Sequence, residues 1–142
     1  MGKFGIIELV IIMVTLLLFL LPFVLYLVTL QNTLKEIKPE NRKMQPGEVW
    51  LIFIPLFGTV WHFIVINRIS DSLKLEFNSR GIHTNENRPG FGIGLAQCIL
   101  FCCGIIPVLG ILSSLAGLIC WIIYWSKIHG FKSKLQYSNS HL

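Results

Sequence analysis

Long apolar runs separated by short polar linkers are the main feature of the chain. The first run extends from Leu9 to Leu30, about 22 residues, with Pro22 as a site for a kink. As a helix it measures roughly 33 Å, enough to cross a hydrocarbon core of about 30 Å. It is longer than the apolar part of a signal peptide, and no small-residue cleavage site follows it. We therefore expect a retained transmembrane helix over residues 5–31.

The second run, from Val49 to Ile66, has about 18 residues and is just long enough to span a bilayer. It predicts a second transmembrane helix over residues 48–67. Pro55 and Gly58 interrupt its middle, and such residues break or bend helices. A re-entrant hairpin that enters and leaves one face therefore stays open as the alternative to a bent spanning helix.

Helical spacing continues beyond the second run. Ile66, Ile69, Leu73 and Phe77 recur at steps of three and four residues, while charged residues occupy other positions. This pattern predicts an amphipathic extension over residues 66–79 that lies on the membrane surface or against a partner.

The last apolar run extends from Phe91 to Trp125. One helix of that length would measure about 50 Å, well beyond the bilayer, so the run must fold back on itself. We expect the bend at Pro107 and Gly110. The predicted elements are two arms of a helical hairpin, over residues 91–106 and 109–127, and a polar tail over residues 129–142. Each arm is short for a spanning helix, so the hairpin either crosses the membrane tightly or enters and leaves one face.

Composition favours a membrane protein. Hydrophobic residues make up 54% of the chain and charged residues 13%, against about 25% charged in an ordinary soluble domain. A soluble fold of 142 residues cannot bury so much apolar surface. A soluble enzyme, a disordered tail and a disulfide-stapled secreted module are thereby excluded. The predicted fold class is an all-α integral membrane helical bundle, with residues 1–142 as a single membrane domain of four apolar segments.

The net charge of +5 arises from basic residues placed between the apolar segments and in the tail. This distribution is typical of membrane proteins, so no nucleic acid partner is expected. With four spans, eight Lys and Arg residues lie on the side of both termini and four on the other. With a re-entrant second segment, eleven lie beside the tail and Lys3 alone lies opposite. Both arrangements predict a cytoplasmic C-terminus.

Three polar side chains in or beside the apolar runs form a candidate intramembrane polar site. His62 lies inside the second run, where an ionisable group often marks an ion path, a ligand or a proton relay. The alternative is a neutral imidazole bonded to a neighbouring helix. Glu8 lies near the start of the first helix, where the helix dipole favours a carboxylate. Gln97 is the only strongly polar side chain of the last run.

The two helix breaks share the pattern Ile-Pro-apolar-apolar-Gly. Pro55 and Gly58 belong to one copy, and Pro107 and Gly110 belong to the other. Broken helices in duplicated halves form the substrate sites of some transporters. Chance recurrence in a sequence rich in Ile and Leu is the alternative explanation.

Small residues mark a candidate helix-packing face on the last helix. Gly110, Ser113, Ser114 and Gly117 follow one side of it, a spacing that lets helix backbones approach closely. The face serves either this chain's own fold or self-association.

The four cysteines lie inside apolar runs, which indicates free thiols rather than a disulfide framework. No CxxC pair and no cluster of His or Asp accompanies them, so we expect no metal and no cofactor. No phosphate-binding Gly-rich loop, HExxH motif or nucleophile elbow occurs, and we expect no catalytic residues and no enzyme activity. The cysteines are Cys98, Cys102, Cys103 and Cys120.

Three segments carry a resemblance to a known group of proteins. They are the run from Pro46 to Trp61, the stretch Arg68 to Phe77, and the closing Cys120 to Ile128. Together they resemble a group of small uncharacterised bacterial multi-pass membrane proteins of flavobacteria and their relatives. The resemblance covers about residues 45–137 and leaves out the first helix. It implies a bacterial plasma membrane location and no particular activity.

These observations favour a non-enzymatic accessory or scaffolding subunit of a membrane complex. The expected partners are the lipid bilayer and either other protein subunits or further copies of the chain. The alternative is a small homo-oligomeric transporter or channel that uses the broken helices and His62. A membrane enzyme acting on lipid or thiol rests on the cysteines alone.

Overall fold

The computed structural model describes residues 5–141, which form five helices and no strand. The all-α fold class expected from the sequence is therefore confirmed for this part of the chain. Two of the helices, α1 and α4, are long and apolar enough to cross a membrane. In chain order the helices are α1 (Ile6–Glu36), η1 (Pro46–Phe53), α2 (Phe57–Arg80), α3 (Phe91–Cys103) and α4 (Gly110–Ser140), of which η1 is a 3₁₀-helix.

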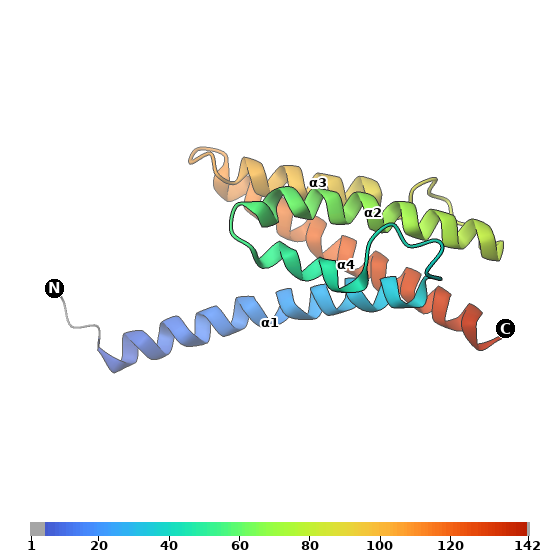
Figure 1. Ribbon diagram of the computed structural model, residues 1–142. Helices are drawn as coiled ribbons and strands as arrows, with labels where there is room; N and C mark the ends of the chain where they lie inside the picture. Colours follow the sequence, from blue (N-terminus) through green and yellow to red (C-terminus); the bar gives the residue numbers. More distant parts are fainter. Residues whose placement is uncertain (1–4, 142) are drawn as a thin grey trace.

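The molecule has an apolar end and a polar end (Figure 1). The apolar end holds the start of α1 and the turns at 54–56 and 104–109. The polar end holds the loops at 37–45 and 81–90 together with the last turns of α4. The fold thus gathers the polar linkers at one end of the molecule and the apolar turns at the other. Apart from Glu8, the charged residues of the described chain lie within 35–48, 68–88 and 127–134.

The second apolar run doubles back on itself instead of forming one helix. Residues 48–67 are divided between η1 and α2 by a turn at 54–56, where Leu56 has a φ of 64°. Pro55 lies in this turn, and a Cβ at position 58 would clash with the carbonyl oxygen of Ile52. The loops before η1 and after α2, at 37–45 and 81–90, therefore both lie at the polar end. The structure does not show the four membrane spans expected from the sequence. At about 2.0 Å per residue, η1 is roughly 16 Å long, too short to cross a bilayer.

The amphipathic extension expected at 66–79 continues α2. Two other boundaries differ from the sequence-based expectation. α3 ends at Cys103 and is about 20 Å long, shorter than a hydrocarbon core. α4 continues to Ser140, through the region expected to be a polar tail at 129–142. The tail is helical because α1 and α2 supply polar partners for it, as described below.

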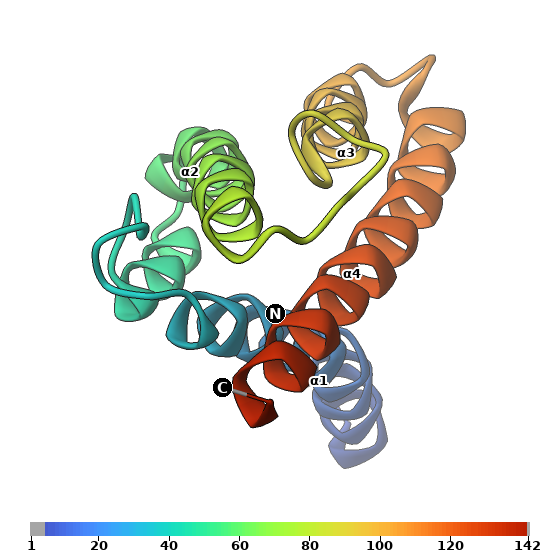
Figure 2. The ribbon, with the colours of Figure 1, turned by 90° about the vertical axis from the view of Figure 1, so that its right-hand side faces the viewer.

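The elements pack in a ring. α1 contacts η1, η1 contacts α2, α2 contacts α3, α3 contacts α4, and α4 contacts α1. Figure 2, which looks along the long axis from the polar end, shows α4 between α1 and α3. The buried core fills the part of the ring nearer the polar end. It includes Leu27, Leu30 and Leu34 of α1, Val65, Ile69 and Leu73 of α2, and Tyr124, Ile128 and Leu135 of α4.

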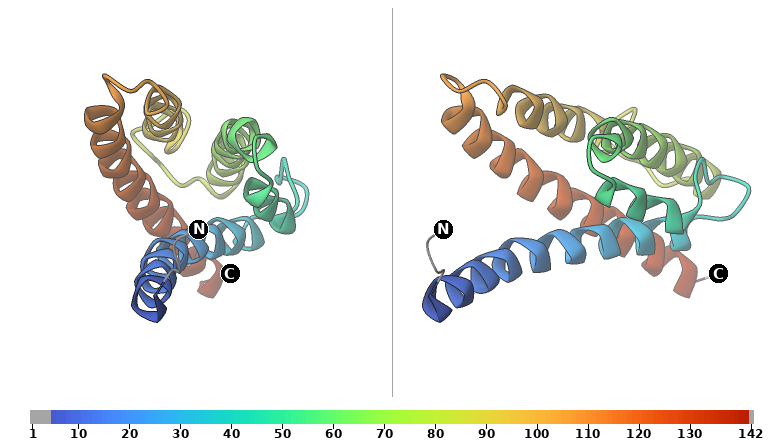
Figure 3. Two further views of the ribbon diagram at one scale, coloured as in Figure 1. Left: turned by 90° about the vertical axis from the view of Figure 1, so that its left-hand side faces the viewer. Right: turned by 60° about the vertical axis from the view of Figure 1, so that its left-hand side comes forward.

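The first half of α1 lies outside this ring. Every side chain from 6 to 21 is exposed, and for Leu18 the exposed fraction is 68%. Figure 3 shows this segment extending away from the other helices. At 1.5 Å per residue it is about 24 Å long. We call this exposed apolar segment, residues 6–21, the α1 arm. It meets α3 and α4 at its end, where Leu18 and Phe19 line a cavity with Phe101 and Trp121.

Candidate functional site

A polar cluster from three helices lies inside the ring. The Tyr26 hydroxyl of α1 lies 3.0 Å from Nε2 of His62 on α2, within hydrogen-bonding distance. The side-chain nitrogen of Gln97 on α3 lies 3.5 Å from the same imidazole nitrogen. Tyr26 and Gln97 are fully buried, and His62 is 8% exposed. The structure therefore brings His62 and Gln97, two of the three expected residues, into one core polar cluster.

Glu8, the third expected residue, lies near the start of the exposed α1 arm, away from the core polar cluster. Its carboxylate accepts a hydrogen bond of 3.2 Å from the backbone N–H of Gly5. The side chain thus caps the first turn of α1, the interaction that a helix N-terminus favours. Glu8 is not part of the core polar cluster.

Tyr26 is the member that the sequence analysis did not single out. Its ring packs against Trp121, Tyr124 and Trp125 of α4, with ring centroids 5.6 to 6.3 Å apart. This aromatic packing fixes the hydroxyl opposite His62. A sequence signal existed, because Tyr26 is one of the few polar side chains within the first apolar run.

Three buried polar atoms near this level of the bundle have no hydrogen-bond partner among residues 5–141. They are Oε1 of Gln97, Nε1 of Trp121 and the hydroxyl of Tyr124. An unpaired buried polar group costs about 1–3 kcal/mol, so such groups are uncommon in folded proteins. Together with the hydroxyl of Tyr26 and the imidazole of His62, they give the core an unusual number of groups able to donate or accept a hydrogen bond.

A cavity of about 170 Å³ lies beside His62. Thr59 and Cys98 also line it, as do Ile52 and Gly58 from the two sides of the turn at 54–56. The first helix break therefore borders the core polar cluster. The second break, formed by Pro107 in the turn between α3 and α4 and by Gly110 at the start of α4, does not line this cavity.

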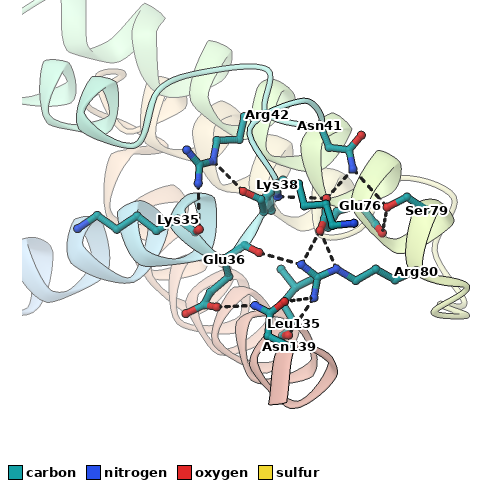
Figure 4. A network of polar contacts seen from close by, with 11 residues as sticks. Lys35, Glu36, Lys38, Asn41, Arg42, Glu76, Ser79, Arg80, Leu135 and Asn139 are labelled. Atoms are coloured by element: carbon teal, nitrogen blue, oxygen red, sulfur yellow. Dashed lines mark hydrogen bonds and ion pairs between the residues drawn. The ribbon is translucent and has the colours of Figure 1, made fainter. Parts of the chain in front are cut away.

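At the polar end, Glu76 of α2 is buried and fully hydrogen-bonded (Figure 4). Its carboxylate accepts hydrogen bonds from the backbone N–H of Lys38 at 3.2 Å and from Nδ2 of Asn41 at 2.6 Å. Nε of Arg80 donates to it at 2.6 Å, and a second Arg80 nitrogen pairs with it at 2.5 Å. The exposed fractions of the Arg80 and Glu76 side chains are 4% and 0%. The hydrogen bonds from Lys38 and Asn41 to Glu76 fix the loop after α1 onto α2.

Arg80 also joins the ends of α1 and α4. Its guanidinium donates to the backbone oxygen of Glu36 at 3.0 Å and to that of Leu135 at 3.1 Å. It also donates to Oδ1 of Asn139 at 2.7 Å. The carboxylate of Glu36 in turn accepts hydrogen bonds from Asn139 at 2.9 Å and Gln136 at 3.1 Å. These contacts, which we call the Arg80 network, hold the helical end of α4.

The loop at 81–90 is held by ion pairs that do not belong to the Arg80 network. Arg88 pairs with Asp71 at 2.7 Å and lies 3.9 Å from the centre of the Phe91 ring. Glu86 pairs with Lys127 of α4, and its other oxygen accepts a hydrogen bond from the backbone N–H of residue 90 at 2.7 Å. The hydrogen bond from Lys127 is the main reason why the pKa of Glu86 lies below its ordinary value.

The small residues of α4 lie against α3. A Cβ at Gly117 would come within 2.9 Å of the Phe101 ring, and one at Gly110 within 2.9 Å of the backbone oxygen of residue 104. The hydroxyl of Ser114 lies 3.1 Å from the place of a Cβ at residue 104, and Ser113 is half-buried. In this structure Gly110, Ser114 and Gly117 contribute to packing within the chain.

The four cysteines are free thiols, and Cys98 is buried beside the cavity. Within residues 5–141, no group of three or more His, Cys, Asp or Glu side chains could hold a metal ion.

No protein-family model, curated protein or solved structure matches the chain. The resemblance to small bacterial membrane proteins therefore stays a prediction, and functional arguments rest on the geometry described above.

Proposed function

We propose that this protein is an integral membrane protein that acts as a non-enzymatic accessory or scaffolding subunit of a membrane complex. The α1 arm carries the proposal. Its side chains from 6 to 21 are almost all apolar and all exposed, on every side of the helix. A helix that is apolar all round is stable only when lipid or other protein surrounds it.

The charge distribution supports a membrane placement with the polar end on the cytoplasmic side. Eleven of the twelve Lys and Arg residues lie within 35–48, 68–88 and 127–134, the segments that include or adjoin the polar end, together with six of the seven acidic residues. Cytoplasmic segments of membrane proteins carry such an excess of basic residues. In this placement α1 crosses the bilayer, and the hairpins η1–α2 and α3–α4 enter it from the cytoplasmic face. The expected membrane is the bacterial plasma membrane implied by the resemblance.

The arm's position favours a protein partner over lipid alone. The Arg80 network fixes the far end of α1, at Glu36, so the arm projects from a rigid base in a defined direction. Helices associate in lipid through close packing rather than through the hydrophobic effect. Because the arm is already helical and fixed in direction, its binding to a partner helix would lose less conformational entropy.

Site-specific photo-crosslinking in native membranes tests this proposal. A photoreactive phenylalanine at Leu17, on the arm, is expected to form an adduct with another polypeptide. The same substitution at Ile119, an exposed apolar residue of α4, is the matched control. An adduct of twice the chain's mass identifies a homo-oligomer. The proposal is wrong if Leu17 labels lipid only and the protein is a monomer in nanodiscs.

The core polar cluster favours a second candidate, a small homo-oligomeric transporter or channel. Tyrosine and histidine side chains in hydrogen-bonding contact can pass a proton, and an intramembrane histidine often does so. A liposome assay tests this candidate: the protein is reconstituted into liposomes, and an enclosed pH-sensitive dye measures proton flux. His62→Ala is expected to abolish the flux, and His83→Ala, which replaces an exposed histidine of the loop at 81–90, is expected to leave it unchanged. Unchanged flux in His62→Ala would remove this candidate.

A further inference from the structure

A groove between α1 and α4 changes character along its length. Its volume is about 530 Å³, which falls within the usual range for small-molecule sites. One section is apolar and the other is polar and basic. Leu25, Val28 and Ile122 line the apolar section, and Asn32, His129 and Lys132 line the basic section.

α1 and α4 both run along the molecule toward its polar end (Figure 1), so the residues that line the basic section lie nearer that end than those that line the apolar section. From Ile122 to Lys132 the groove extends about 15 Å along α4. Trp125 lies between the two sections, and its Nε1 donates a hydrogen bond of 2.9 Å to the hydroxyl of Thr29. Tryptophan is enriched at the level where the hydrocarbon of a bilayer meets the headgroups. The groove thus crosses that level.

The basic section has a cation available for a ligand. Lys132 forms no salt bridge within residues 5–141. The carboxylate one turn beyond Asn32 on α1 is Glu36, and both of its oxygens already accept hydrogen bonds from Gln136 and Asn139. The ammonium of Lys132 and the ring N–H of His129 are therefore free to meet an anion beside Asn32.

We infer that the groove binds one anionic glycerophospholipid. The phosphate lies against Lys132, His129 and Asn32, and an acyl chain follows Leu25 and Ile122 toward the apolar end. An amphiphile fits because the apolar and basic sections meet end to end at the interfacial Trp125. A soluble anion would use the basic section alone. The inference rests on the membrane placement given under the proposed function.

Lipid retention by the purified full-length chain tests the inference. The protein is extracted in a mild detergent, mixed with phosphatidylglycerol or phosphatidylcholine, and examined by native mass spectrometry. Wild type is expected to retain phosphatidylglycerol in preference to phosphatidylcholine. Lys132→Gln is expected to weaken that retention about tenfold, the effect of losing one charge-assisted hydrogen bond. Lys134→Gln is the matched control, because it removes the same charge from α4 outside the groove.

A second variant separates a lipid from a free phosphate. Ser126→Phe fills the middle of the groove and leaves every charge in place. It is expected to reduce phosphatidylglycerol retention as Lys132→Gln does. Normal retention in Ser126→Phe, together with displacement of the lipid by inorganic phosphate, would mean a phosphate site and overturn the inference. Equal losses in Lys132→Gln and Lys134→Gln would also overturn it, because they would show unspecific attraction.

Membrane fractionation of the same variants distinguishes the two proposals. Wild-type protein that remains in the supernatant of lysed cells without surfactant contradicts the membrane placement itself. Wild-type protein that sediments with membranes but shows no preference for phosphatidylglycerol contradicts only the lipid site.

Discussion

Replacement of Glu76 by glutamine is the sharpest test of how the bundle is held together. The Glu76 side chain is fully buried, and its carboxylate accepts hydrogen bonds from Lys38, Asn41 and Arg80. Glu76→Gln keeps the shape of the side chain but removes its charge. The glutamine side chain also has an NH₂ group, a donor, where Glu76 has an oxygen that accepts hydrogen bonds. This donor would face the donor groups of the residues that now bind the carboxylate. Arg80 then stays buried, at 4% exposed, without its counter-charge.

The expected cost follows from that burial. Removing one partner of a buried ion pair destabilises a protein by about 3–5 kcal/mol, because the remaining charge is not compensated. The half-exposed pair of Glu86 and Lys127 gives the contrast, with exposed side-chain fractions of 34% and 40%. Pairs exposed to solvent contribute about 0–1 kcal/mol. Glu86→Gln is therefore the matched control, with the same chemical change at an exposed site.

Urea unfolding in detergent micelles, followed by circular dichroism, measures both variants. Glu76→Gln is expected to lower the free energy of unfolding by several times the change in Glu86→Gln. Hydrogen exchange should also increase at residues 130–140, because Arg80 holds Leu135 and Asn139. If Glu76→Gln proves as mild as Glu86→Gln, or if residues 130–140 stay protected, the reasoning about the Arg80 network is refuted.

Three further outcomes are expected. Gly94→Val should destabilise the fold by about 1–3 kcal/mol, because a Cβ at position 94 would lie 2.8 Å from the Tyr124 ring; unchanged urea unfolding would contradict this packing. Because Lys127 lowers the pKa of Glu86, the contribution of this carboxylate is present above its unfolded pKa and is lost as the pH falls through the lowered value. Unfolding measured between about pH 6 and pH 3 should therefore lose part of its acid sensitivity in Glu86→Gln, and an identical profile would count against the pairing. Leu17→Lys should reduce the membrane-bound fraction in cell fractionation, since a lysine at the centre of a spanning helix costs about 2.5–3.5 kcal/mol of insertion free energy; full membrane recovery would show that the arm does not span.

The helical fold class could be predicted from the sequence because apolar runs of this length leave few alternatives. The path of the second run could not. Pro55 and Gly58 mark a break in the pattern, but either a bend or a complete reversal satisfies that pattern. The reversal is accompanied by a tertiary contact, the hydrogen bond of 2.8 Å from Nε1 of Trp61 to the backbone oxygen of Glu48. Local sequence patterns do not reveal such contacts.

The end of α4 shows the same limit. Its residues are polar, and the pattern alone indicates a solvated tail. They are helical in the structure because Arg80 and Glu36, which are far away in the sequence, bind the side chains and backbone there. Glu76 is one of the charged residues between the apolar positions of 66–79, and the loop after α1 covers it in the structure.

The candidate site was predictable only in part. An imidazole in an apolar run is conspicuous, so His62 could be singled out, and Gln97 could be chosen for the same reason. Nothing in the sequence indicates that these two side chains meet, because their contact depends on how α2 packs against α3. Tyr26 completes the cluster only because the aromatic residues of α4 orient its ring.

α1 is held by the rest of the chain over its C-terminal half, and its N-terminal half is exposed. The Arg80 network joins α1, α2 and α4 at the polar end, while the opposite 24 Å or so of α1 forms the exposed arm. A long apolar helix responds to a thinner bilayer by tilting. If α1 spans a membrane as proposed, such a tilt would turn α1 about its fixed polar end and move the surface that it contributes to the groove with α4. The thickness of the membrane would then change the shape of that groove.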